Sequence, residues 1–375
     1  MSELSLDHGT VKNQNRNLVF RKIYDTPGMT RQQIIRGSEL SPPTVGNYIK
    51  QLDAMGLIEE VKLEGGRSQI GRKASGLSIK ADARYALGVE IRKDLFKLFL
   101  TDIYGHVVGS SFSETAFSAE EMYLRPLAGR IEALLDQEHI DRSRVVGVGL
   151  AITSRVFEDT GLLSSYVLGI DKVSFLGFSK YIPYPISVRQ IASAALFANV
   201  QRRKEHENLA YIWIGEVLAA SVTLHHDFYY GKNSLGMEIN HLCMERNGRL
   251  HSCGKRGCLG AYCSSDRLGG GLFGSLDAFF AALDAGDPLA EREWEVYLDI
   301  LSMAINNIHL ILDCDIVLGG PVGCRMAGRV SDIEERIKEM DPYWRDDDAI
   351  LIDDDEDSPA VGGALTVLTD FISAL

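Results

Sequence analysis

The feature that most constrains this chain is an alternation, from residue 81 onward, of short apolar segments with long amphipathic ones. Five apolar runs bounded by glycine or charged residues are short enough to be strands: 85–91, 95–102, 145–152, 210–214 and 315–318. Residues 119–136 and 294–312 repeat apolar side chains at three- and four-residue spacing, which predicts helices. Alternating strands and helices predict an α/β body, and the distances between the strands predict two similar lobes with a cleft.

The N-terminal part shows a different, mainly helical pattern. Apolar residues at helical spacing predict a first helix over 15–25, and Thr30 and Ser41 are N-cap candidates for helices over 31–38 and 42–55. A helix, a short helix, a turn and a helix with a polar outer face form the helix-turn-helix arrangement, whose last helix enters the DNA major groove.

A strand-like segment, 57–61, and two glycine-rich basic clusters follow the third helix. They predict a winged helix-turn-helix, since arginine on such a loop can reach phosphates or a narrow minor groove. Thr44, Asn47 and Lys50 are the predicted base contacts. The full set of predicted DNA-binding residues is Arg31, Ser41, Thr44, Asn47, Tyr48, Lys50, Arg67, Arg72 and Lys73. The alternative is a small helical adaptor that binds protein.

Charge divides the chain in the same place. Residues 1–80 carry 12 Lys and Arg against 8 Asp and Glu, a net charge of +4, which leaves −17 for the remainder of a chain whose total is −13. A basic head on an acidic body indicates that the head meets a polyanion, although chance variation on a solvated surface is the alternative. We therefore predict a DNA-binding domain at 1–80 and a second domain at 81–375.

Several function classes are excluded by composition. No apolar run approaches the roughly 20 residues that a membrane helix needs, and the first ten residues lack the basic start and apolar stretch of a secretory signal. We expect a cytoplasmic protein without a membrane partner. The acidic runs at 346–348 and 353–357 lack the glycine and terminal glutamate of a calcium loop, so they are expected to form a solvated face.

Taken together, these segments resemble the ROK family of repressors, uncharacterised reading frames and sugar kinases, whose body has an actin-like or hexokinase-like ATPase fold. The resemblance covers nearly the whole chain, from Asn15 to the C-terminal helix. Besides the winged head, its motifs are GVEI at 88–91, LTDIYG at 100–105, GVG at 147–149, GMEINH at 236–241, CGKRGCL at 253–259 and LGGP at 318–321. The cysteine-rich motif is the most specific of them.

The cysteine-rich motif also predicts a structural zinc site. His241, His251, Cys253 and Cys258 follow the spacing H-x9-H-x-C-x4-C, which supplies four nitrogen and sulfur ligands. In a cytoplasmic chain, clustered cysteines favour a metal over disulfides. His251 stands where the family usually has a cysteine. Buried thiols without metal are the alternative, Cys243 is a substitute ligand candidate, and Cys263 is expected to pack in a helix.

Phosphotransfer requires groups that this chain lacks at the matching positions. Family kinases carry their general base in an Asn-Asp pair that opens a helix; here Arg189 and Gln190 take those positions, and neither is a base at neutral pH. The first phosphate-binding turn matches 90–94, which has no glycine. The second, usually Gly-Thr-Gly-x-Gly, matches 215–219, where a carboxylate (Glu216) and branched side chains occupy the phosphate site. We therefore expect no enzyme activity; a ROK-type sugar kinase with an added head is the alternative.

The family's sugar pocket is only partly retained. Glu238 and His241 match positions that contact sugar hydroxyls, whereas Gly260 stands in place of a sugar-binding glutamate. Arg189 adds a guanidinium suited to a carboxylate or phosphate, unless it pairs internally with Glu238 or Glu216. The predicted effector-binding residues are Arg189, Gln190, Glu238 and His241. The candidate effectors are a sugar, a sugar phosphate or a carboxylate, and a body that binds no ligand stays open.

These observations lead to one interpretation of function. The chain is interpreted as a DNA-binding transcriptional regulator, in the first place a repressor, whose head binds a double-stranded operator and whose body forms a homodimer or homotetramer. An effector would favour a body geometry in which two heads no longer match the half-site spacing. The competing classes are the sugar kinase and a zinc-braced protein-interaction module.

Overall fold

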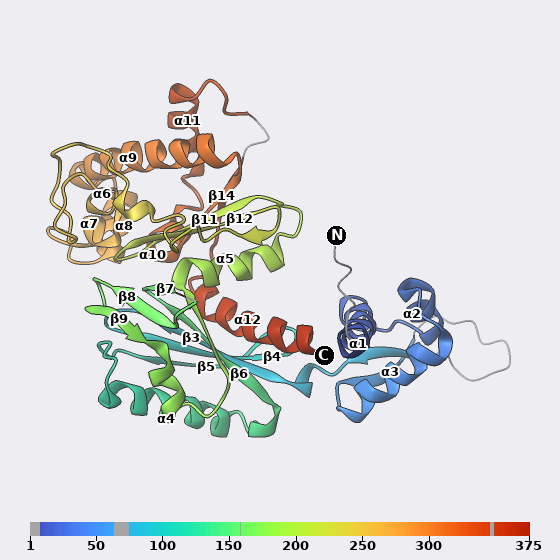
Figure 1. Ribbon diagram of the computed structural model, residues 1–375. Coiled ribbons are helices and arrows are strands. Elements are labelled where there is room, and N and C mark those ends of the chain that lie inside the picture. The colour runs from blue at the N-terminus through green and yellow to red at the C-terminus, as the bar shows by residue number, and fades with distance from the viewer. Residues whose placement is uncertain (1–7, 64–74, 158, 346–348) are drawn as a thin grey trace.

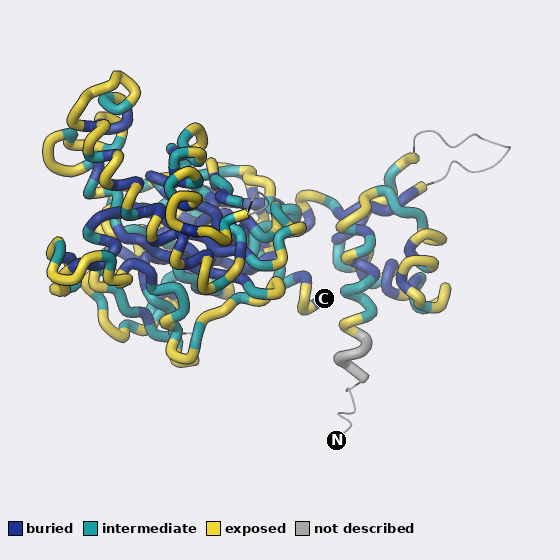
Figure 2. Tube along the Cα trace, turned by 90° about the horizontal axis from the view of Figure 1, so that it is seen from above, coloured by how far each residue is buried: buried dark blue, intermediate teal, exposed yellow. Residues whose placement is uncertain are grey.

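The computed structural model describes residues 8–63, 75–157, 159–345 and 349–375. A small N-terminal head lies beside a larger body that consists of two lobes, and the last helix of the chain runs between the lobes toward the head (Figure 1). Seen from above, the head projects from one end of the body (Figure 2).

Three helices form the head, as the sequence predicts: α1 (His8–Asp25), α2 (Arg31–Ser38) and α3 (Pro42–Ala54). Both predicted N-caps are confirmed. The Thr30 hydroxyl accepts a hydrogen bond from the Gln33 N–H, and the Gln33 side-chain oxygen accepts one from the Thr30 N–H. The two bonds form a capping box. The Ser41 hydroxyl accepts from the Thr44 N–H and begins α3.

A two-stranded antiparallel hairpin follows the helices. Its strands are β1 (Ile58–Lys62) and β2 (Ser75–Ile79). The hairpin that the sequence predicts is therefore present at its base, whereas the predicted wing residues Arg67, Arg72 and Lys73 lie outside the described residues.

The first lobe is built on a five-stranded sheet in the order β10-β6-β3-β4-β5. Its strands are β3 (Tyr85–Ile91), β4 (Phe96–Asp102), β5 (Val107–Ser113), β6 (Val145–Ile152) and β10 (Ile186–Gln190). Helix α4 (Glu121–Gln137) packs its apolar side on this sheet. A small antiparallel sheet lies at its edge, made of β7 (Arg155–Phe157), β8 (Leu162–Ser165) and β9 (Ile170–Ser174).

The second lobe repeats this plan with the order β13-β12-β11-β14-β15. Its strands are β11 (Leu209–Ile214), β12 (Leu218–Leu224), β13 (Asp227–Phe228), β14 (Asp315–Gly319) and β15 (Ile350–Ile352). In both sheets three consecutive strands pair antiparallel and two further strands add in parallel. The two similar lobes predicted from strand spacing are thus confirmed.

Short and long helices complete the second lobe. They are α6 (Gly260–Cys263), α7 (Ser265–Gly269), α8 (Leu276–Asp284), α9 (Pro288–Leu312), α10 (Gly320–Gly323) and α11 (Val330–Met340). Within the described residues α9 alone is long and apolar enough to cross a membrane. Because Trp294, Leu298 and Leu301 on α9 are buried in the core of the second lobe, the helix is weak evidence for a span.

Two helices fill the space between the sheets: α5 (Ile191–Arg202) and α12 (Ser358–Ala374). Two strand glycines let α12 approach the first sheet closely. A Cβ on Gly88 of β3 would lie 1.8 Å from the Ala360 carbonyl oxygen, and one on Gly149 of β6 would lie 1.9 Å from that of Gly363. The helix backbone therefore rests directly on the strands.

The head shares a hydrophobic core with the body. Phe20 and Ile23 of α1 are fully buried in the same cluster as Leu368 and Ile372 of α12. The Arg16 and Asn17 side chains donate hydrogen bonds to carbonyl oxygens at the C-terminal end of α12. The head is thus packed against the body and fixed to the end of α12, which Figure 1 shows beside α1.

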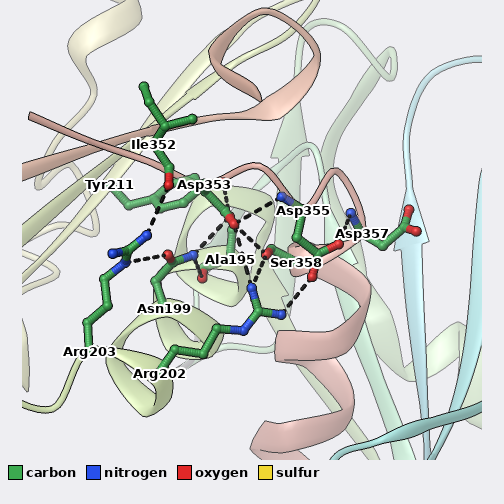
Figure 3. A network of polar contacts seen from close by, with 10 residues as sticks. All are labelled: Ala195, Asn199, Arg202, Arg203, Tyr211, Ile352, Asp353, Asp355, Asp357 and Ser358. Carbon is green, nitrogen blue, oxygen red and sulfur yellow. Dashed lines mark hydrogen bonds and ion pairs between the residues drawn. The ribbon is translucent and has the colours of Figure 1, made fainter. Parts of the chain in front are cut away.

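Within the acidic run at 353–357, Asp353 does not lie on the solvated face that the sequence predicts, and the run at 346–348 lies outside the described residues. Asp353 is only 2% exposed and accepts hydrogen bonds from the Asn199 amide and the Tyr211 hydroxyl, both at 2.9 Å, and from the Ser358 hydroxyl at 3.0 Å (Figure 3). Arg202 reaches Asp353 as well. The expectation was wrong here because partners from α5, β11 and α12 surround the carboxylate, and they fix the N-terminal end of α12.

Candidate effector cavity, metal centre and DNA-facing helix

A cavity of about 610 Å³ lies between the two lobes. It is lined by the residues after β6, the β8–β9 hairpin, the junction of β10 and α5, the start of β12 and residues 235–241. Gln190, Glu238 and His241, three of the four predicted effector residues, line it. We call it the interlobe cavity.

Arg189, the fourth predicted effector residue, lies outside the interlobe cavity. Its guanidinium donates to the Thr366 hydroxyl and the Tyr230 hydroxyl, each at 2.9 Å, and stacks 5.1 Å from the ring centres of Phe197 and Phe228. Arg189 is therefore bound within the protein, but by Thr366 and Tyr230 and not by Glu238 or Glu216, the partners that the sequence left open. Neighbouring residues of a strand point to opposite faces, so Gln190 faces the cavity and Arg189 does not.

The position of the family's sugar-binding glutamate is sterically closed. A Cβ on Gly260 would lie 2.0 Å from the Asn240 amide oxygen and 2.8 Å from His251 Nε2. The Asn240 oxygen also accepts from the Leu218 N–H at 3.4 Å. The space that a glutamate would occupy is therefore already filled by an amide that the second lobe holds in place.

The two segments that match phosphate-binding turns are bound to each other. Arg92, after β3, donates to both carboxylate oxygens of Glu216, at 3.2 and 2.9 Å, and both side chains are about four-fifths buried, with 17% and 21% exposed. Val217 follows Glu216 and lines the interlobe cavity. An internal ion pair and a branched side chain thus lie where the fold would otherwise receive phosphates.

Behind this pair lies a buried carboxyl group. Glu90 of β3 is 0% exposed, and neither of its oxygens has a hydrogen-bond partner among the described residues. Its nearest cation, the Arg92 guanidinium, is 3.9 Å away, an ion-pair distance that is too long for a hydrogen bond. Burial raises the pKa of Glu90 to about 7, against the opposing pull of Arg92 and Lys97.

The predicted metal ligands converge on one point. The ligand atoms of His241, His251, Cys253 and Cys258 all lie within 4.8 Å of one another. The two sulfurs are 3.9 Å apart, far longer than a disulfide and close to the separation of about 3.8 Å that tetrahedral zinc–thiolate bonds of about 2.3 Å would give. Burial raises the pKa of the Cys258 thiol and lowers that of His251. The donor set and its geometry fit zinc.

The other cysteines of this region are placed as follows. Cys243 is exposed and is not part of the four-ligand cluster. Its pairing with Cys258 is an isolated antiparallel bridge between the two backbones. Cys263 is buried in helix α6, as the sequence predicts. Its thiol faces the Tyr297 carbonyl oxygen. Tyr166 connects the cluster to the interlobe cavity, since its ring lies about 6 Å from the rings of both histidines.

Helix α3 presents a polar face to solvent. Asn47 and Lys50 are exposed and Thr44 is half-buried, in keeping with the predicted base contacts. The prediction that Tyr48 contacts DNA is wrong. Its side chain is 5% exposed and packs in the head core, so it does not face DNA. Arg31, on α2, pairs with Glu60 at 3.4 Å on the surface.

Sequence reasoning missed Arg155 and the Arg92–Glu216 pair. Arg155 lines the interlobe cavity from the start of β7. The position of Arg155 in the sequence could have identified it. Ligands of α/β folds bind beyond the carboxyl ends of parallel strands, and Arg155 follows the predicted strand at 145–152.

The family assignment follows from comparison with known proteins. A family model described as "ROK family" matches residues 86–370. The chain belongs to the ROK family. Among curated ROK-like relatives, the xylose repressor of Bacillus subtilis is 24% identical over 267 residues, which cover 70% of this chain and 68% of that protein. The transcriptional repressor Mlc of Escherichia coli is 23% identical over 271 residues, or 69% and 64% of the two chains.

Solved ROK structures share the fold. A ROK family transcriptional regulator, described as a homologue of E. coli Mlc, superimposes with a TM-score of 0.78 at 20% identity, covering 97% of this chain and 98% of that one. A ROK glucokinase from Streptomyces griseus, in complex with glucose and AMPPNP, has a TM-score of 0.64 at 17% identity and covers 75% and 98%. The hexokinase-like body with a helical head is thereby confirmed as the fold.

Glu90 makes the stability of the protein depend on pH. Between its ordinary pKa of 4.5 and about 7, the folded chain keeps a proton that the unfolded chain has lost, so stability falls as pH rises through this window and is level above it. We expect Glu90→Gln to remove this dependence. In urea unfolding, the wild type should lose up to about 3 kcal/mol relative to the variant between pH 5 and pH 8.

The matched control is Glu59→Gln on the exposed face of β1, which should show the same difference from wild type at both pH values. A Glu90→Gln variant whose difference from wild type is also independent of pH would contradict the assignment.

Proposed function

We propose that this ROK protein is a DNA-binding transcriptional repressor with a catalytically inactive body. The observation that carries the proposal is the ion pair between Arg92 and Glu216, which occupies the matched phosphate turns, together with the absence of a carboxylate at positions 189 and 190. Phosphoryl transfer needs both a cradle for phosphates and a base for the attacking hydroxyl. Repressors among the relatives support the same conclusion.

The DNA-binding part of the proposal assigns residues 1–80 to operator binding and 81–375 to the regulatory body. The polar face of α3, with Thr44, Asn47 and Lys50, enters the major groove, and Arg31, Ser41 and the wing residues Arg67, Arg72 and Lys73 contact phosphates. The net charge of +4 on residues 1–80 supports this division. The protein acts in the cytoplasm as a homodimer or homotetramer, because a two-headed assembly reads two half-sites.

The regulatory part places a carbohydrate-derived effector in the interlobe cavity. Residues of both lobes line it, so a ligand there binds unequally to open and closed arrangements. Because α12 packs between the lobes and ends against α1, a change in lobe arrangement moves the head. The effector thereby alters the spacing of two heads on the operator.

The metal part assigns Zn²⁺ to His241, His251, Cys253 and Cys258. The role is structural: four protein ligands leave no position for substrate, and the ion braces the segment 241–258, one end of which lines the interlobe cavity.

Base recognition by α3 is tested by Asn47→Ala. Full-length protein first selects its sites from a random duplex library, and mobility shift then measures affinity for the selected site and its single-base variants. Loss of a bidentate base contact should weaken binding by about 1–3 kcal/mol and abolish preference at one base pair. The control Asn233→Ala, exposed on the body, should match wild type. Unchanged affinity and preference in Asn47→Ala would rule out this placement of α3.

The zinc assignment is tested by metal analysis after exhaustive dialysis. Wild-type protein should retain about one equivalent of zinc per chain, and Cys253→Ser should lose most of it, because a structural site needs four ligands. Cys243→Ser is the matched control, since the exposed Cys243 lies outside the cluster, and it should retain the metal. Retention by Cys253→Ser combined with loss in Cys243→Ser would show that the ligand set is wrong.

A further inference from the structure

The interlobe cavity contains one guanidinium and one carboxylate that the described part of the protein leaves without a hydrogen bond or ion pair. They belong to Arg155, whose guanidinium lies 5.2 Å from the Phe157 ring centre, and to Glu238, at the N-terminal end of the short helix Ile239–His241. Burial raises the pKa of Glu238, and the charge of Arg155 acts in the opposite direction, so the two groups lie within electrostatic range of each other.

Most other polar side chains of the cavity are already bound within the protein. The Ser165 hydroxyl donates to the Thr153 carbonyl oxygen at 2.7 Å, and the Ser164 hydroxyl donates to Asp171 at 2.9 Å. Gln190 caps α5 by accepting from the Ser193 N–H at 3.2 Å. Arg155 and Glu238 are therefore the groups whose hydrogen-bonding capacity a ligand in the cavity would satisfy.

We propose that the interlobe cavity binds a hydroxylated carboxylic acid of monosaccharide size, a hexuronate or an aldonate, whose carboxylate pairs with Arg155. The planar fork of a guanidinium matches a carboxylate with two parallel hydrogen bonds. A hydroxyl of the same ligand donates to Glu238, which is the contact by which a carboxylate recognises a sugar. This inference rests on the proposed function, since it names the class of effector that the repressor would bind.

The size and the remaining walls of the cavity suit such a ligand. Its volume of about 610 Å³ lies within the range of about 300–1,000 Å³ for small-molecule sites. Ile191, Val217 and Leu235 supply apolar surface for the hydrocarbon face of a sugar ring. Apolar walls also strengthen the guanidinium–carboxylate interaction, because they exclude water from it.

The charge of the cavity favours a carboxylate over a phosphate ester. Asp171 and Glu238 both line the cavity, and Arg155 is its single arginine or lysine within the described residues. A carboxylate would add one negative charge beside Arg155 and these two carboxylates, whereas a phosphate dianion would add two, so repulsion disfavours the phosphate more strongly. Arg189 does not add to the balance, since it lies outside the cavity and is bound by Thr366 and Tyr230.

The test is a calorimetric titration of the full-length protein with matched ligands. The panel is glucuronate, galacturonate and gluconate, with glucose, galactose and glucose 6-phosphate as counterparts that differ in one group. At least one acid should bind ten-fold or more tightly than its neutral sugar and than the phosphate. Arg155→Gln should abolish that preference, and Arg189→Gln, with thermal unfolding as a folding check, should keep it.

Several results would overturn the proposal: tighter binding of a neutral sugar or of the phosphate, no binding of any panel member, or an acid preference that survives Arg155→Gln. Loss of the preference in a stably folded Arg189→Gln alone would place the ligand outside the interlobe cavity and would also overturn it. DNA binding by the same preparations, without ligand, is measured in parallel. Retained DNA binding would leave the proposed function standing, whereas its absence in wild type would count against the function itself.

Discussion

The close packing of α12 against both lobes and the head is the constraint on which the rest of the structure depends. Gly88 and Gly149 let the helix backbone rest on the first sheet, the Asp353 network fixes its N-terminal end to α5 and β11, and its C-terminal end shares a core with α1. Because a packed interior transmits displacement instead of absorbing it, we expect a change in the arrangement of the lobes to displace the head. Helix α12 thus links the two lobes of the body to the helical head.

The cleft keeps the fold of a phosphotransferase, but different side chains stand at the positions that match the phosphate-binding turns and the general base. Arg92 and Glu216 hold the two matched phosphate turns together, and Glu90 lies buried behind them. A buried ion pair is weak evidence for stability, because desolvation of both charges offsets their attraction. Its effect here is on specificity: a triphosphate would have to break the pair and place its charges next to Glu216.

Local features of the fold could be predicted from the sequence, because short-range chemistry determines them. The caps at Thr30 and Ser41 and the strands 85–91 and 145–152 agree with the structure. The prediction that Tyr48 faces DNA was wrong, because Tyr48 lies three residues after Val45 on the apolar side of α3 and its ring is buried in the head core.

Long-range features could not be predicted in the same way. A run of carboxylates shows its charge but not the partners from α5 and β11 that bury Asp353. The convergence of His241, His251, Cys253 and Cys258 could be predicted because their spacing is short and their chemistry specific. The choice between Arg189 and Arg155 depends on which face of a strand meets the cavity, and this is set by sheet register and by the second lobe.

The loss of nucleotide binding is tested most directly by equilibrium titration of the full-length protein with MgATP and with its non-hydrolysable analogue. Enzymes typically have KM values of about 1 μM to 1 mM for their substrates, so a titration to about 5 mM covers this range. With Arg92 and Glu216 paired across the cleft, no saturable binding is expected. Saturable binding of either nucleotide to the wild-type protein, with its phosphate resonances perturbed by the protein, would contradict the conclusion that this cleft holds no phosphate site.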